Sequence, residues 1–158
     1  MMRKLRSWAI RIGHPLRKLY WRIAKPEGHG VKVMAFDEEG RLLLVRHSYG
    51  RSDLWMLPGG AIDKGEEADA AAIRELKEET ALDADGLTLF AHYLNNLEGK
   101  RDHVTLFTCT VKGAPRIDEQ EIIEARFFAL HALPDTISAA TYRRVVDWQK
   151  GRAHTNRW

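Results

Sequence analysis

Three glutamates lie close together in the segment RELKEET. Glu75, Glu78 and Glu79 stand at positions i, i+3 and i+4, which a helix places within an arc of about 100°. Like charges at this spacing repel one another, and the pairing of Arg74 with Glu78 on a solvated face offsets only about 0.3–0.5 kcal/mol. Mg²⁺ prefers carboxylate oxygens and is completed by water and substrate phosphates. A divalent cation would remove the repulsion, so the spacing indicates a site for metal-assisted chemistry on phosphates.

A glycine-rich stretch, LPGGAIDKGEE, comes directly before the three glutamates. Gly59 and Gly60 can adopt backbone angles that are closed to other residues, and they let main-chain groups approach a ligand closely. A carbonyl or amide from this loop could face the helix and complete a metal or phosphate site. We therefore expect the loop and the helix to form one site.

The segment Gly60–Leu82, GAIDKGEEADAAAIRELKEETAL, resembles the Nudix box of the Nudix hydrolase family. That box reads G-x5-E-x7-R-E-U-x-E-E-x-G-U, where U is a bulky aliphatic residue. The stretches VRHSYGRSDLWMLPGG and EARFFALHALP also look like the regions that flank the box. The resemblance covers about residues 30–135. It implies an enzyme that hydrolyses a pyrophosphate bond in a nucleoside diphosphate linked to another group, with Mg²⁺ or Mn²⁺ as cofactor.

The resemblance also assigns roles to residues of the box. Arg74 would orient Glu75 through an ion pair, and Glu66 would support the junction of loop and helix or reach the metal through water. The metal ligands would be Glu75, Glu78, Glu79 and the Gly59 carbonyl. The general base varies within the family, and the candidates here are Glu98, Glu119, Glu121 and Glu124. Metal ions that bridge a diphosphate stabilise in-line displacement by water.

Other residues are candidates for holding the substrate. Arg46 and Arg51 could contact phosphates, and Tyr93 could stack on a base. We expect ordinary packing for His47 and for the single cysteine, Cys109. In place of the family's usual glycine the box has Ala81, and we expect the helix to continue from it toward Gly86.

The sequence does not choose among several classes of small nucleotide substrate. No DNA partner is expected. Neither the proline nor the tyrosine that marks two known subfamilies is present in the segment NNLEGKR. One alternative is an RNA 5′-end pyrophosphohydrolase that uses basic ends to hold the RNA backbone. Residues 1–30 carry a net charge of +7 and residues 143–158 carry +4, whereas residues 31–142 carry −8. A second alternative is a nucleotide-sensing Nudix module without catalysis.

The elements that must position these residues follow from the apolar pattern. The segment 66–81 is rich in good helix formers, and 138–150 is an amphipathic helix. Within the first of these helices, Ile73, Leu76 and Thr80 are expected to face the core. Strands are predicted at 31–37, 41–47, 87–95, 103–112 and 124–130. The fold expected is α/β (α+β), a Nudix-type α/β/α sandwich with a mixed sheet.

The chain divides into a basic amphipathic extension at 1–29, a Nudix domain at 30–150 and a tail at 151–158. An apolar stripe in the extension could pack on the domain, form a homodimer or lie on a membrane surface through residues 1–25. Its members are Leu5, Trp8, Ile12, Leu16, Leu19, Tyr20 and Ile23. One cysteine permits no internal disulfide, so a reducing, cytoplasmic location is expected.

Overall fold

The computed structural model describes residues 28–95, 102–117, 120–152 and 158. The predicted extension therefore lies almost entirely outside the described residues, and the division at 1–29, 30–150 and 151–158 stays a prediction. The elements, in chain order, are β1 (Gly28–Phe36), β2 (Leu42–His47), α2 (Ala68–Thr80), β3 (Asp85–Asn95), β4 (Asp102–Thr110), β5 (Ile122–Phe128) and α3 (Ala139–Gln149). All five of these predicted strands and both predicted helices of the domain are confirmed, with ends that differ from the prediction by at most three residues. In the described part of the chain, no helix is long and apolar enough to cross a membrane.

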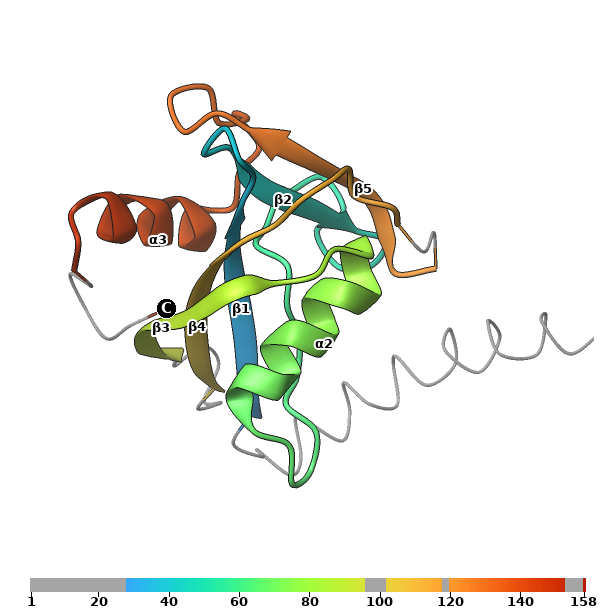
Figure 1. The fold of residues 1–158 in the computed structure, drawn as a ribbon, viewed down its shortest axis with the longest axis vertical. Helices are drawn as coiled ribbons and strands as arrows, with labels where there is room; N and C mark the ends of the chain where they lie inside the picture. Colours follow the sequence, from blue (N-terminus) through green and yellow to red (C-terminus); the bar gives the residue numbers. More distant parts are fainter. Residues whose placement is uncertain (1–27, 96–101, 118–119, 153–157) are drawn as a thin grey trace, which may run out of the picture.

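The five strands form one mixed sheet in the order β3-β4-β1-β2-β5. β1 runs parallel to β4, while the other neighbouring pairs are antiparallel. β1 and β2 share only the pair Phe36–Leu42, next to the turn that joins them. Figure 1 shows β2 and β5 turning away from the long axis of β1. The sheet is therefore forked between β1 and β2.

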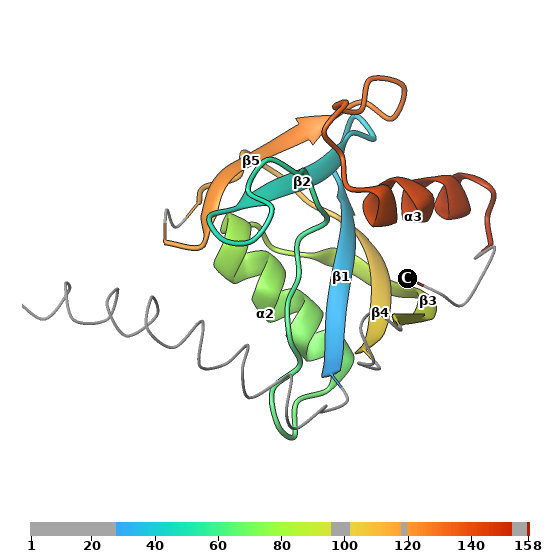
Figure 2. The same ribbon diagram turned by 180° about the vertical axis from the view of Figure 1, so that it is seen from behind.

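A loop fills the edge of β1 that β2 leaves. Val31 N–H donates to the Gly60 carbonyl at 2.9 Å, and Val33 N–H donates to the Pro58 carbonyl at 3.0 Å. Figure 2 shows the segment that leads into α2 passing between that helix and β1. The glycine-rich loop is thus held along its length by a strand of the sheet.

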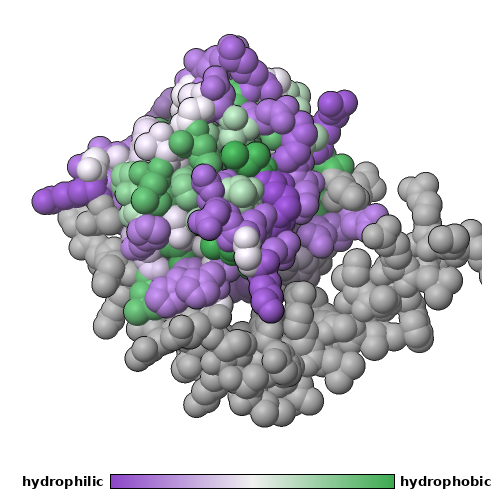
Figure 3. Space-filling model, turned by 60° about the horizontal axis from the view of Figure 1, so that its bottom comes forward, coloured by the Kyte–Doolittle hydropathy of each residue, from purple (hydrophilic) through white to green (hydrophobic). Residues whose placement is uncertain are grey.

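Each face of the sheet is covered by one helix, which confirms the α/β/α sandwich. Alternate residues of β1 serve the two sides, because successive side chains of a strand point to opposite faces. Val31 and Val33 pack with Ala72 and Leu76 of α2. Met34 and Phe36 belong to the cluster that includes Val145 of α3. On the face drawn in Figure 3, hydrophobic residues form a band across the middle, with hydrophilic residues on both sides.

Two expectations about α2 were wrong. Ile73 is 48% exposed, because the buried side of α2 is centred near Ala72, and Ile73 lies about 100° around the helix from Ala72. The helix does not continue toward Gly86: Ala81 itself takes the left-handed conformation, with φ 59°, and its N–H donates to the Lys77 carbonyl at 2.9 Å. Alanine does what glycine would do here, at a backbone cost of about 1–2 kcal/mol.

Candidate functional site

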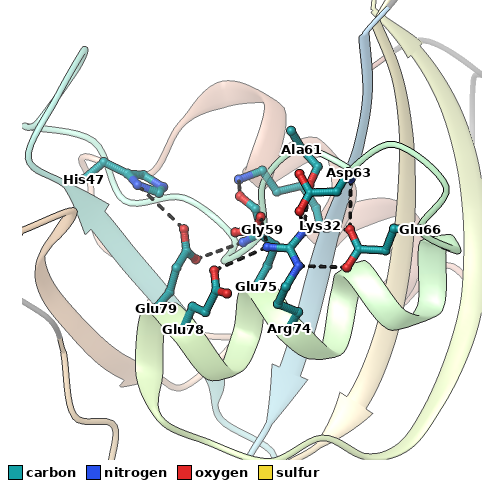
Figure 4. A network of polar contacts seen from close by, with 10 residues as sticks. All are labelled: Lys32, His47, Gly59, Ala61, Asp63, Glu66, Arg74, Glu75, Glu78 and Glu79. Atoms are coloured by element: carbon teal, nitrogen blue, oxygen red, sulfur yellow. Dashed lines mark hydrogen bonds and ion pairs between the residues drawn. The ribbon is translucent and has the colours of Figure 1, made fainter. Parts of the chain in front are cut away.

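The site lies where the Gly59–Gly60 turn meets the carboxylate side of α2. Figure 4 shows Glu66, Arg74, Glu75, Glu78 and Glu79 turned toward the loop and the end of β2. Helix spacing brings the α2 side chains to one face, and the hydrogen bonds from Val31 and Val33 fix the turn against them. The structure therefore places the loop beside the carboxylate face of the helix, and the assignment of a site to them stays a prediction.

Arg74 connects the groups in one half of the site through hydrogen bonds. Its Nε and Nη2 donate to the two carboxylate oxygens of Glu66, each at 2.8 Å. Its Nη1 donates to Glu75 at 2.8 Å and to Glu78 at 3.3 Å, and Nη2 also reaches the Ala61 carbonyl at 3.1 Å. The bond from Arg74 holds the pKa of Glu66 down, at about 2. Arg74 thus ties the loop to the helix and fixes the orientation of Glu75.

Glu66 has a second contact that explains its place in the box. Its Oε2 accepts from the backbone N–H of Asp63 at 2.9 Å, inside the loop. The glutamate therefore joins the loop backbone to Arg74. These contacts agree with a supporting position at the junction of loop and helix, one of the two roles that the family resemblance implied for it.

Glu79 forms the other half of the site and is almost completely buried, with 6% of its surface exposed. Its Oε2 accepts from the Gly59 N–H at 2.9 Å. Burial raises the pKa of Glu79 to about 7, against opposing effects of Lys32 and of the Gly59 N–H. Burial also raises the pKa of Glu75. For both carboxylates, the cost of burial outweighs the stabilisation of the ionised form by nearby positive charges.

The two glycines leave room for this arrangement. Gly59 has φ 131°, a conformation that L side chains rarely adopt, and a Cβ there would overlap the Val31 carbonyl oxygen. A Cβ on Gly60 would lie 2.6 Å from the carboxylate carbon of Glu75. The Glu75 carboxylate occupies the space that any other residue at position 60 would need.

Lys32 and His47 complete the site, although the sequence reasoning missed both. The Lys32 ammonium donates to the Gly59 carbonyl at 2.7 Å and to the Leu57 carbonyl at 3.0 Å. His47 Nδ1 lies 3.8 Å from Glu79 Oε1, and within the described ranges it has no hydrogen-bond partner. Burial lowers the pKa of His47 to about 4, so the ring is neutral near pH 7 and the contact is not an ion pair.

Signals for both residues were present in the strands. Lys32 is the single charged residue of an otherwise apolar run, VKVMAF. His47 lies four residues after Leu43 in β2, so the two side chains point to the same face of the sheet. Leu43 packs in the cluster beneath α2. The expectation of ordinary packing for His47 overlooked this alternation.

The candidate bases lie in different places. The charge of Glu121, an exposed residue, acts on Glu79 and raises its pKa. Glu124 pairs instead with Arg46 at 3.6 Å and with Arg126 at 2.6 Å. Glu98 and Glu119 lie outside the described residues. Of the described candidates, the structure brings Glu121 toward the carboxylates and not Glu124.

The three candidates for substrate contact are not gathered at the site. Tyr93 is 2% exposed and lies in the cluster beneath α3, with the Arg144 guanidinium 4.1 Å from its ring centre. Arg46 lies over the Trp55 ring at 5.5 Å, on the sheet face opposite to His47. Arg51 is exposed and pairs with Asp53. Tyr93 and Arg46 lie away from the site because successive side chains of a strand point to opposite faces of the sheet, and theirs point to the face that α3 covers.

The titration of Glu79 gives a testable prediction for the metal-free protein. The folded state holds a proton up to about pH 7, whereas the unfolded carboxyl loses it near its ordinary value of 4.5. This stabilisation is therefore fully present below pH 4.5 and is lost as the pH rises through 7. In EDTA, the free energy of unfolding of the wild type should fall by about 2 kcal/mol between pH 5 and pH 8, relative to Glu79→Gln. Urea unfolding at both pH values measures this, and an unchanged difference between the two proteins would contradict it.

Comparisons with known proteins agree with this geometry. The model of the NUDIX domain matches residues 26–149. A candidate 8-oxo-dGTP diphosphatase of Bacillus subtilis (strain 168) is 30% identical over 129 residues, which cover 80% of this chain and 83% of that protein. An RNA pyrophosphohydrolase of Sphingopyxis alaskensis is 44% identical over 50 residues, which cover 32% of each chain. The crystal structure of a MutT NUDIX hydrolase from Burkholderia pseudomallei superposes with a TM-score of 0.67 at 25% identity, covering 77% of this chain and 97% of that one.

The family match spans both the sheet and the box, and the relative from Bacillus subtilis is matched over most of its length. The similar crystal structure shares the arrangement of strands and helices. The chain therefore belongs to the Nudix hydrolase family.

Proposed function

We propose that this chain hydrolyses a pyrophosphate bond in a nucleoside diphosphate linked to another group, with Mg²⁺ or Mn²⁺ held by Glu75, Glu78 and Glu79. The observation that carries the proposal is the approach of two buried carboxylates, Glu75 and Glu79, to the Gly59–Gly60 turn. Buried carboxylates with raised pKa values require a cation in order to ionise fully.

The donor set fits a hard divalent cation. Carboxylate oxygens and a backbone carbonyl are the ligands that Mg²⁺ prefers. Among the described residues, no three acidic, histidine or cysteine side chains are grouped closely enough to hold a metal ion, and Arg74 occupies oxygens of Glu75 and Glu78. Glu78 is 61% exposed, so its carboxylate can leave Arg74 and turn toward Glu75 and Glu79.

The chain's own residues have distinct roles in this reaction. When bound, the divalent ion supplies positive charge at the diphosphate and lowers the pKa of water. Arg74 fixes Glu75 and, with Glu66, holds the loop in place, while the Gly59 N–H fixes Glu79. Glu121 is the described residue that we propose accepts the proton of the attacking water, and Glu98 and Glu119 stay predictions.

For the substrate we propose a small nucleoside triphosphate or a related diphosphate derivative. The relative from Bacillus subtilis, whose match covers most of both chains, is a candidate 8-oxo-dGTP diphosphatase. RNA 5′ ends are the second candidate, because several matched relatives are RNA pyrophosphohydrolases, although each match covers less than half of either chain.

The test is a panel of substrates with the full-length protein. Nucleoside triphosphates including 8-oxo-dGTP, nucleotide sugars, ADP-ribose, dinucleoside polyphosphates and 5′-triphosphate RNA are each incubated with Mg²⁺, Mn²⁺ or EDTA, and the products are separated. Metal-dependent release of a nucleoside monophosphate from a small substrate supports the proposal. Turnover of RNA alone, weakened steeply by salt, would select the second candidate. Nucleotide binding without turnover would leave a sensing module.

Arg74→Lys tests the positioning of the carboxylates. Lysine keeps the charge, but it cannot place separate donors on Glu66, Glu75 and the Ala61 carbonyl as the guanidinium does. Changing a residue that orients metal ligands typically costs 10–100-fold in activity or metal affinity, and we expect a loss of about 30-fold in both. Steady-state kinetics and Mn²⁺ titration measure the two effects.

Lys77→Arg is the matched control for Arg74→Lys. Lys77 lies on the same helix and pairs with Asp83 at 2.8 Å, away from the loop. It should keep wild-type values. A full-activity Arg74→Lys enzyme would show that the arginine only stabilises the fold.

A further inference from the structure

The proposed function assigns no role to Lys32. This lysine interrupts a strand whose neighbouring residues, Val31 and Val33, are 1% and 0% exposed. Burying a lysine is costly unless its charge is matched nearby, because desolvation disfavours the charged form. A methionine or leucine would pack in the same strand without that cost, so the position calls for an explanation beyond packing.

The ammonium of Lys32 lies beside the loop that carries one of the predicted metal ligands. It donates to the Gly59 carbonyl at 2.7 Å, and that oxygen is itself one of the predicted ligands. Burial lowers the pKa of Lys32, and the charges of Glu79 and Glu75 oppose that effect. In turn, the charge of Lys32 favours the ionised carboxylate of Glu75 and of Glu79. Figure 4 shows Lys32 behind Gly59, across the site from Arg74. Lys32 therefore already meets, as a cation, three of the four groups assigned to metal.

We propose that Lys32 is a fixed cation of the site that takes the place of one divalent ion, so that the chain binds a single divalent ion before substrate arrives. The inference rests on the proposed function, since it concerns the same carboxylates. It differs from a purely structural role, in which Lys32 would only pin the loop to β1.

The balance of charge supports a single ion. Within the network of box glutamates, Arg74 and Lys32, the four glutamates Glu66, Glu75, Glu78 and Glu79 carry four negative charges when ionised, and the two basic residues supply two positive ones. The remaining two negative charges are neutralised by one divalent ion. Once one divalent ion is bound, no net negative charge of this network is left to attract a second ion in the absence of substrate phosphates, whereas one negative charge would be left without Lys32.

The Gly59 oxygen gives a second reason. A divalent ion on the Gly59 carbonyl oxygen would lie close to the ammonium that donates to the same oxygen at 2.7 Å, and the two cations would repel each other in this partly buried place. Removing the ammonium frees the oxygen and leaves three uncompensated negative charges. A second divalent ion then has both a ligand and a charge to neutralise.

The experiment is a titration of metal-free protein with Mn²⁺, in which free Mn²⁺ is followed by electron paramagnetic resonance. The wild type should bind one ion per chain. Lys32→Met should bind two, with the first ion held at least tenfold more tightly, and Lys32→Arg should return to one because it keeps the charge. The control is Lys112→Met, which removes an exposed lysine paired with Glu38 at 4.0 Å and should match the wild type.

Thermal unfolding of each variant shows that it is folded, and Lys32→Gln is a second uncharged variant if Lys32→Met does not fold. Folded uncharged variants that bind the wild-type number of ions with wild-type affinity would overturn the inference, and a lower melting temperature alone would assign Lys32 a structural role. The proposed function would survive that result if the wild type still bound Mn²⁺ and needed it for turnover. A wild type that bound no Mn²⁺ would overturn both.

Discussion

Glu79→Gln should lower kcat by about 10³-fold while leaving the protein folded. Glutamine has nearly the same shape and its amide oxygen can still accept from the Gly59 N–H, so the loop stays in place. It removes the negative charge from the most buried carboxylate of the cluster, and loss of one such electrostatic group typically costs 10²–10³-fold in rate. Steady-state kinetics on the preferred substrate measures the effect, together with Mn²⁺ affinity.

Glu67→Gln is the matched control for this change. Glu67 precedes α2, is exposed, and makes no capping hydrogen bond with its side chain. It should keep full activity, so that loss of charge in general is separated from loss of charge at the site. If Glu79→Gln retained more than a tenth of wild-type activity, Glu79 would not be a ligand of the essential metal.

Gly59→Ala should be the most damaging single change to stability. The backbone at Gly59 has φ 131°, and a methyl group there would overlap the Val31 carbonyl oxygen and lie 2.9 Å from the Lys32 Cα. Both obstacles are backbone atoms in the central strand, which cannot give way as a flexible side chain would. We expect a loss of about 3 kcal/mol or more, and a melting temperature lower by roughly 10 °C.

Gly40→Ala separates backbone strain from overlap. Gly40 also has positive φ, 72°, but nothing lies within 4 Å of its added methyl group. It should cost only about 1 kcal/mol. Calorimetry of the three proteins gives the comparison. Equal melting temperatures for the two variants would show that the loop can move away from β1 at little cost.

The spacing of the box predicted much of the site, because helix geometry is local. Glu66, Arg74 and Glu75 lie close together in the sequence, joined by a turn and a short stretch of helix. A correct prediction of the helix and the loop therefore already brings them into contact. The failures concern contacts between distant parts of the chain. Lys32 and His47 come from other strands, and their place depends on strand order and register, which local pattern does not define.

The end of α2 shows a different limit. A glycine is the residue expected in a left-handed helix end, so an alanine was taken as a sign that the helix would continue. The strain at Ala81 is small compared with the burial of Leu82, which is 4% exposed and packs in the cluster beneath α2. Tertiary packing therefore outweighs the local preference. Tyr93 was misplaced for a related reason, since its face of β3 depends on which side α3 covers.

The fork between β1 and β2 has a consequence for the loop's motions. Because the Val31 and Val33 amides donate to loop carbonyls and not to a neighbouring strand, the loop serves as a short sixth strand at that edge. If it lifts, these two amides in the middle of the sheet lose their acceptors and exchange with solvent. Amide protons in the central strand of the sheet thus report on opening of the site, while the rest of the sheet stays protected.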